Sequence, residues 1–209
     1  MAVSYKNKSK IYGLLDRIYF KNKCNSPRYI LANKIENSDY KILEIAVGTA
    51  ENCIILARNK PKLNIIGIDM SEQMLNIAKN NIKNENISNI ELLKMNGLNM
   101  SFIKETFDYI IISLLLHEIP EEISDKILSG CRKILKNNGK IYILEWEYPK
   151  KIIQKIVFLT IKLFEPKEFK LFMEKDLNKY FNKNGFQIRD VEYGDYSKVI
   201  ELVKCATST

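Results

Sequence analysis

The chain has 209 residues, of which 46% are hydrophobic and 28% are charged; these proportions exclude a disordered chain and allow one domain with a sizeable core. The longest nearly uninterrupted apolar run, residues 109–116, is far shorter than the roughly 20 residues of a membrane-spanning helix. Residues 1–10 are polar and basic and lack the apolar stretch of a secretory signal, so we expect a cytoplasmic protein.

The first predicted element is helical, because apolar residues recur at helical spacing over residues 9–36, with a break at Pro27. From residue 40 onwards, short apolar runs alternate with helical patterns. The predicted strands cover residues 40–47, 63–68, 89–94, 107–114 and 140–146. The predicted helices cover residues 51–59, 71–84 (with Ser71 as N-cap) and 121–136, and the last is followed by a turn at Asn137-Asn138-Gly139. Such alternation favours βαβ units and a parallel sheet.

The C-terminal residues follow a different pattern. A predicted helix over residues 176–184 precedes two strands, 186–193 and 198–204, which are separated by the turn Gly194-Asp195. Two strands with so short a connection form an antiparallel hairpin. The sequence therefore predicts an α/β fold in a single domain over residues 1–209: a doubly wound, mostly parallel seven-stranded sheet with a C-terminal antiparallel hairpin.

The cysteine and histidine content argues against a metal centre. The cysteines are Cys24, Cys53, Cys131 and Cys205. No pair of them has the close spacing of a zinc or redox motif, and the single histidine, His117, excludes a site with several histidine ligands. We expect reduced thiols that pack as small apolar side chains, and no metal.

Small residues alternate in the segment that follows the first predicted strand. Ala46, Gly48 and Ala50 stand at every second position after Glu44. A turn between a strand and a helix needs small residues where its backbone approaches a ligand. Their spacing differs from the G-x-G-x-x-G of dinucleotide-binding turns, and the chain has no GK[ST] of a phosphate-binding loop.

This segment resembles motif I of the class I S-adenosylmethionine (SAM)-dependent methyltransferases, E/D-x-G-x-G-x-G, with alanine in place of the first and third glycines. Alanine fits these two places if their φ angles are negative. Three further segments are similar to the family in register: residues 67–75 around Asp69, Asn96-Gly97, and residues 107–119 around His117. The resemblance covers residues 40–146 and is to the small-molecule, ubiquinone/menaquinone-type members. It implies a Rossmann-like fold with an N-terminal helical cap, residues 1–38, and a lid insert, residues 147–175.

The resemblance also implies which residues bind SAM. It assigns the methionine end to Glu44, Ala46, Val47 and Gly48. It assigns the ribose to Asp69, a carboxylate at the end of the second strand, as in other doubly wound nucleotide sites. It assigns the adenine to Met70, Asn96 and Gly97, the surroundings of the sulfonium to Ser113 and Leu114, and the cover over the cofactor to Tyr12.

His117 is the candidate catalytic residue. It follows the fourth predicted strand, beside the expected site of methyl transfer, and an imidazole suits a general base at neutral pH. The alternative is a histidine that bonds the backbone at the start of a helix or merely packs. The residues expected to contact the acceptor are Tyr19, His117, Trp146 and Tyr148.

The positive charge is concentrated in the two segments that cover the active site in this family. Residues 1–38 carry a net charge of +6 and residues 148–183 a net charge of +5, while the whole chain carries +8. The insert is also rich in aromatic and aliphatic side chains. Three interpretations stay open: an ordinary lid with solvated lysines, a helix over residues 152–164 on an anionic membrane, and a contact with RNA.

Nucleic acid is disfavoured as a partner, because adenine methylases of RNA and DNA usually carry Asn/Asp-Pro-Pro-aromatic where this chain reads Ser113-Leu-Leu-Leu. We therefore predict SAM-dependent methyl transfer, by in-line displacement at the sulfonium methyl, to a small, largely apolar or aromatic acceptor. The alternatives are a lipid or prenylquinone methyltransferase with peripheral membrane contact, and a non-catalytic SAM-binding protein on the same fold. We expect a monomer or homodimer.

Overall fold

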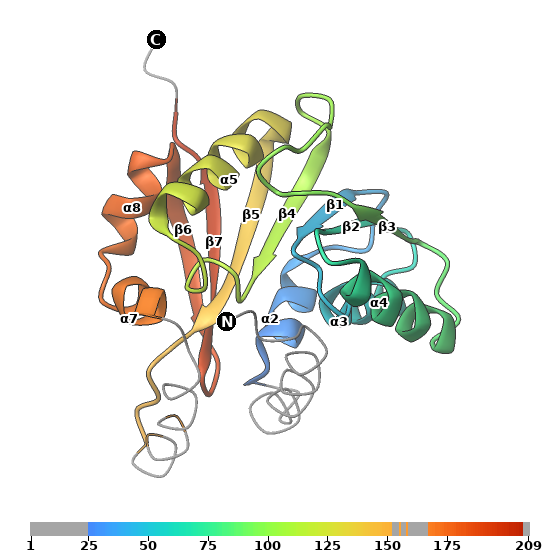
Figure 1. Ribbon diagram of the computed structural model, residues 1–209, viewed down its shortest axis with the longest axis horizontal. Coiled ribbons are helices and arrows are strands. Elements are labelled where there is room, and N and C mark those ends of the chain that lie inside the picture. The colour runs from blue at the N-terminus through green and yellow to red at the C-terminus, as the bar shows by residue number, and fades with distance from the viewer. Residues whose placement is uncertain (1–24, 152–154, 156–157, 159–166, 207–209) are drawn as a thin grey trace.

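Seven strands form one sheet in the order β3-β2-β1-β4-β5-β7-β6 (Figure 1). The computed structural model describes residues 25–151, 155, 158 and 167–206. The strands are β1 (Lys41–Ile45), β2 (Asn64–Asp69), β3 (Ile90–Lys94), β4 (Phe107–Ser113), β5 (Leu135–Trp146), β6 (Phe186–Tyr193) and β7 (Ser197–Lys204). Strands β1 to β5 pair in parallel, whereas β7 pairs antiparallel with both β5 and β6. The predicted α/β class, with its C-terminal antiparallel hairpin, is confirmed.

Helices flank the sheet, and Figure 1 shows α5 lying across β4 and β5. The helices are α2 (Pro27–Lys34), α3 (Glu51–Asn59), α4 (Glu72–Asn84), α5 (Glu121–Ile134), α7 (Lys167–Met173) and α8 (Leu177–Lys183). Ser71 is the N-cap of α4, as predicted, and its side chain accepts a hydrogen bond from the Met74 amide at 3.3 Å. This bond satisfies one of the amide groups that the first turn of a helix leaves unpaired.

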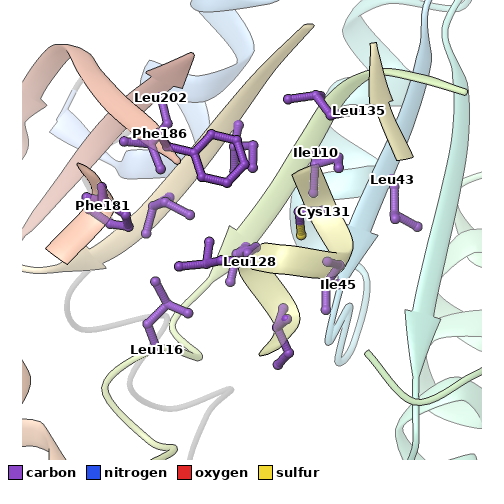
Figure 2. Close-up of a cluster of buried hydrophobic side chains, with 14 of the residues drawn as sticks. Leu43, Ile45, Ile110, Leu116, Leu128, Cys131, Leu135, Phe181, Phe186 and Leu202 are labelled. Atoms are coloured by element: carbon purple, nitrogen blue, oxygen red, sulfur yellow. The ribbon is translucent and has the colours of Figure 1, made fainter. Parts of the chain in front are cut away.

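Apolar side chains cover both faces of the central strands. In β4, Ile110 and Ile112 belong to the core cluster beneath α5 and α8, whereas Ile111 belongs to the cluster beneath α2 and α3. Figure 2 shows Leu128 and Cys131 of α5 packed over the first of these faces. Because successive side chains of a strand point to opposite faces, a strand buried on both faces becomes a continuous apolar run.

The predicted turn at Asn137-Asn138-Gly139 is wrong in detail, since these residues lie within β5, which begins at Leu135. Phe107 pairs with Leu135 and Tyr109 with Lys140, so β5 advances five residues while β4 advances two. The turn residues therefore occupy an irregularity inside the strand, as the extra residues of a β-bulge do.

Of the predicted helix over residues 9–36, the structure describes only the part from residue 25 onwards, and that part contains α2. Pro27 is the first residue of α2 and follows the extended N-cap residue Ser26, so the predicted break lies at the start of this helix. The fixed φ of proline and its missing amide hydrogen suit the first turn. Tyr12, Tyr19, Cys24 and most of residues 152–164 lie outside the described residues. Within the part of the chain that the structure describes, no helix is long and apolar enough to cross a membrane.

Candidate functional site

The candidate site lies at one edge of the sheet. Strands β1 to β5 are parallel, so the residues that follow their carboxyl ends meet there, as ligand-binding residues do in doubly wound folds. These residues include the turn after β1, Asp69 at the end of β2, Asn96 after β3 and Leu114 after β4. The pairing of Ile45 with Ile112 brings the turn after β1 beside the end of β4.

The turn after β1 is held in a left-handed backbone conformation at three positions. The φ angles are 55° at Ala46, 55° at Gly48 and 66° at Ala50. The expectation of negative φ at the two alanines is therefore wrong. Hydrogen bonds hold the turn: the Val47 amide donates to the Ile68 carbonyl at 2.9 Å, and the Ala50 amide donates to the Val47 carbonyl at 2.9 Å. The turn keeps a conformation suited to glycine although two of its three places are alanine.

The carboxylate of Asp69 connects this turn to the start of α4. One oxygen accepts a hydrogen bond from the Gly48 amide at 3.0 Å, and the other accepts one from the Ser71 amide at 2.8 Å. Asp69 is half-buried. Each carboxylate oxygen can accept more than one hydrogen bond, so both can also receive a hydroxyl of a bound ligand.

Glu44 lies beneath the turn, with 2% of its surface exposed. Its two oxygens accept hydrogen bonds from Asn52 Nδ2 at 2.6 Å and from Cys53 Sγ at 2.8 Å, both in α3. Asn52 in turn accepts a hydrogen bond from Arg28 Nε of α2 at 3.2 Å. Burial raises the pKa of Glu44 and also that of Cys53. In this structure Glu44 anchors α3 under the turn.

Among the described residues, the turn is uncrowded at Gly48. A Cβ atom built on Gly48 would meet no atom of these residues nearer than the Ala46 carbonyl oxygen at 4.0 Å. Met70, beside Asp69, exposes 65% of its surface, which is unusual for a large apolar side chain. Asn96 is also exposed, and its side-chain oxygen accepts a hydrogen bond from the Leu98 amide at 2.9 Å.

The glycine after Asn96 and the residues after β4 are closely packed. A Cβ atom on Gly97 would lie 3.1 Å from Ile45 Cγ2, which is tighter than an ordinary contact. Ser113 ends β4, and Leu114 has a φ of 50° while its amide donates to the Leu144 carbonyl at 2.8 Å. A bulky residue with positive φ is uncommon and is found where the surrounding structure requires it.

His117 is buried, with 1% of its surface exposed, and it pairs with a carboxylate. Its Nδ1 atom lies 2.5 Å from Glu145 Oε2, and the other oxygen of Glu145 accepts a hydrogen bond from the Leu116 amide at 2.9 Å. Glu145 itself is fully buried in β5. His117 precedes α5, which begins at Glu121, so it does not start a helix.

Aromatic rings connect His117 to the other predicted acceptor residues. Phe169 of α7 contacts the His117 ring edge-on, with centroids 5.6 Å apart. Phe158 contacts Phe169 at 6.2 Å, Trp146 at 6.2 Å and Tyr148 at 5.5 Å. Three of the four residues predicted to contact the acceptor are thus joined in one cluster through Phe158 and Phe169, and Tyr19 lies outside the described residues.

Glu145 is the site residue that sequence reasoning missed. The available signal was a carboxylate inside the apolar run Lys140–Trp146, since a charged side chain in a buried strand needs a partner. In the described residues no group of three or more His, Cys, Asp or Glu side chains could hold a metal ion.

Comparison with known proteins identifies the family. The model of the ubiE/COQ5 methyltransferase family matches residues 15–201. The chain belongs to this family. Demethylmenaquinone methyltransferase of Bacillus subtilis is 33% identical over 134 residues, which cover 63% of this chain and 57% of that protein. The corresponding enzyme of Thermotoga maritima is 29% identical over 158 residues, which cover 74% of this chain and 66% of that protein.

Solved structures support the same fold. A SAM-dependent methyltransferase from Aquifex aeolicus superimposes with a TM-score of 0.72 and 18% identity, covering 94% of this chain and 96% of that protein. The predicted resemblance to small-molecule class I methyltransferases is therefore confirmed for family and fold. The matched segment spans little more than half the length of the Bacillus relative.

Proposed function

We propose that this member of the ubiE/COQ5 family transfers a methyl group from SAM to a small, largely apolar or aromatic acceptor. The observation that carries this proposal is the arrangement of two halves of a site at one sheet edge. One half is the left-handed turn tied to Asp69, and the other is the buried pair of His117 and Glu145 beside aromatic rings.

The residues on the cofactor side fit SAM. The open space above Gly48 allows the methionine end to approach the backbone, and the carboxylate of Asp69 is placed to accept hydrogen bonds from the ribose hydroxyls. The exposed Met70 and Asn96 would contact the adenine. When bound, SAM supplies a methyl group that its sulfonium has already activated, so the chain must orient the reactants and exclude water.

The acceptor side suits a flat apolar molecule. Phe158, Phe169 and Trp146 form a buried cluster packed against Leu114, which follows β4. Rings of this kind bind aromatic ligands by stacking or edge contacts. The Bacillus relative is named for demethylmenaquinone, and we propose a quinone-type acceptor here. His117 would accept the proton that the acceptor loses.

The alternative of a non-catalytic SAM-binding protein rested on the two missing glycines. The turn keeps positive φ at both alanines, which supports cofactor binding, and the buried pair of His117 and Glu145 supports proton transfer. The first observation removes the reason for that alternative, and the second favours the enzyme. A membrane-surface acceptor would be compatible with Leu171 of α7, which exposes 65% of its surface and follows Lys170 in the sequence.

The proposal is tested by SAM titration in a calorimeter and by release of the demethylated cofactor with a panel of hydroquinones. We expect Asp69→Ala to weaken SAM binding roughly 10- to 100-fold, because charge-assisted hydrogen bonds are lost. Asp108→Ala is the matched control, since Asp108 accepts a hydrogen bond from the Lys41 amide at 2.9 Å at the opposite end of the sheet. Equal SAM affinity in the two variants would exclude Asp69 from the site, and absence of SAM binding by the unmodified protein would refute the proposal.

A further inference from the structure

We propose that Glu145 is a positioning residue that fixes the tautomer of His117, with the proton on Nδ1. The inference rests on the proposed function, in which His117 is the general base. It adds a second residue to that step, and it makes a statement about the imidazole that can be measured without any substrate.

The position of Glu145 is fixed by two hydrogen bonds from the segment that follows β4. Its carboxylate is fully buried, and its oxygens contact the Leu116 amide at 2.9 Å and His117 Nδ1 at 2.5 Å. The Leu116 amide can only donate. Glu145 therefore holds two successive residues, and these contacts fix the direction of the His117 ring.

The same contacts decide which ring nitrogen carries the proton. With Glu145 ionised, its carboxylate only accepts hydrogen bonds, so His117 Nδ1 is the donor, and in a neutral imidazole the lone pair is then on Nε2. In the reaction Nε2 takes the proton of an acceptor O–H. The acceptor oxygen, or a carbon conjugated with it, forms the bond to the methyl carbon, and the electrons of the broken carbon–sulfur bond remain on sulfur. The imidazolium that results lies beside the Glu145 carboxylate, which stabilises it.

An amide cannot replace this carboxylate. In Glu145→Gln the amide oxygen can accept from the Leu116 amide, which leaves the NH₂ group toward His117 Nδ1. Nδ1 must then accept, and the proton moves to Nε2, where it blocks the base. If the amide is turned around, its NH₂ group faces the Leu116 amide, and two donors meet in a buried place. The first arrangement removes the tautomer that has its proton on Nδ1. The second disrupts the segment that contains Leu116 and His117.

Nuclear magnetic resonance of the imidazole tests the inference directly, because the chain contains one histidine. In protein labelled with ¹⁵N-histidine we expect Nδ1 of the unmodified protein to carry the proton and Nε2 to show the shift of an unprotonated nitrogen. Glu145→Gln should move the proton to Nε2. Glu147→Gln is the matched control, since Glu147 follows two residues later and pairs with Lys198 at 3.0 Å; it should leave the tautomer unchanged.

Kinetics supply the second measurement. Glu145→Gln should lower kcat roughly 10²- to 10⁴-fold, the range of general-base catalysis, while the Kd of SAM stays within about twofold. In a His117→Asn background the same substitution should cause no further loss of kcat, because the role of Glu145 in proton transfer requires His117.

An Nε2-protonated imidazole in the unmodified protein would overturn the inference, and this spectrum needs no variant that might misfold. An additional loss of kcat in the His117→Asn background would also overturn it, since it would indicate a role in folding or in SAM binding. If the tautomer is as expected but His117→Asn methylates at the normal rate, the positioning by Glu145 is supported and the base assignment in the proposed function fails.

Discussion

Ala46 and Ala50 adopt a backbone conformation that disfavours every residue with a Cβ atom. Their φ angles are 55° and 66°, and left-handed backbone costs an L-residue roughly 1–2 kcal/mol. The turn retains this conformation because its amides are hydrogen-bonded to β2 and within the turn. Backbone strain of this kind persists where the surrounding structure requires one geometry. Here the strained turn is the proposed cofactor site.

Replacing Ala46 by glycine should therefore stabilise the protein. We expect Ala46→Gly to raise the free energy of unfolding by about 0.5–1 kcal/mol, because relief of the left-handed cost exceeds the extra freedom of glycine in the unfolded chain. Urea denaturation measures the change. Ala57→Gly, within α3, is the control and should destabilise by about 1 kcal/mol. Equal losses in the two variants would contradict the strain at Ala46.

Helices α5 and α8 are held together at their ends by ion pairs. Glu121, in the first turn of α5, accepts from Lys175 at 2.7 Å and from Lys183 at 3.0 Å. Asp125 accepts from Lys183 at 2.7 Å and from Asn184 at 2.9 Å. The hydrogen bonds from Lys175 and Lys183 lower the pKa of Glu121 below its ordinary value of 4.5. The folded state therefore binds a proton at Glu121 less tightly than the unfolded chain does.

This difference gives the Glu121 ion pairs a pH-dependent contribution to stability. The contribution is present above about pH 4.5 and is lost as the pH falls through the lowered pKa of Glu121. Because 47% of the side chain is exposed, we expect Glu121→Gln to cost at most about 1 kcal/mol at pH 7 and less at pH 3. Denaturation at the two pH values checks this, with Glu72→Gln, which removes an exposed ion pair with Lys94, as a control with a smaller effect. An equal loss at both pH values would contradict the ionic origin.

At the scale of the whole molecule, Gly67 of β2 lies between the proposed cofactor turn, which follows β1, and the neighbouring strand β3. A Cβ atom on this residue would lie 2.8 Å from Val47 Cγ2, in the turn, and 2.9 Å from Leu92 Cδ2, in β3. Val47 is 5% exposed and belongs to the core, so it has little room to move.

We expect Gly67→Ala to lower the free energy of unfolding by about 1–3 kcal/mol through overpacking and to weaken SAM binding several-fold by displacing Val47. Calorimetry with SAM and thermal unfolding measure both effects. Gly130→Ala in α5 is the control, because among the described residues its Cβ would meet only the flexible end of Met100 and alanine favours a helix. Unchanged SAM affinity in a destabilised Gly67→Ala protein would show that the turn is independent of this packing.

The sequence was sufficient for the order and type of the elements over residues 40–146 and 176–204, since apolar runs such as residues 107–114 and helical patterns such as residues 121–136 carry clear periodicities. Helix α7 was not predicted. It also located the residues that follow the strands. The φ angles of Ala46 and Ala50 could not be read from it, because residue type alone indicates the ordinary conformation. The pairing of His117 with Glu145 depends on the register of β4 on β5, in which Ser113 lies beside Leu144, and no local pattern specifies that register.

The carboxylate of Asp69 also preorganises the proposed cofactor site. It accepts hydrogen bonds from the Gly48 amide and the Ser71 amide, and these bonds within the chain order the turn as part of the fold. A ligand that reaches this edge meets a preorganised surface, and more of its contact energy remains available as affinity. The site thus obtains affinity from the stability of the fold itself.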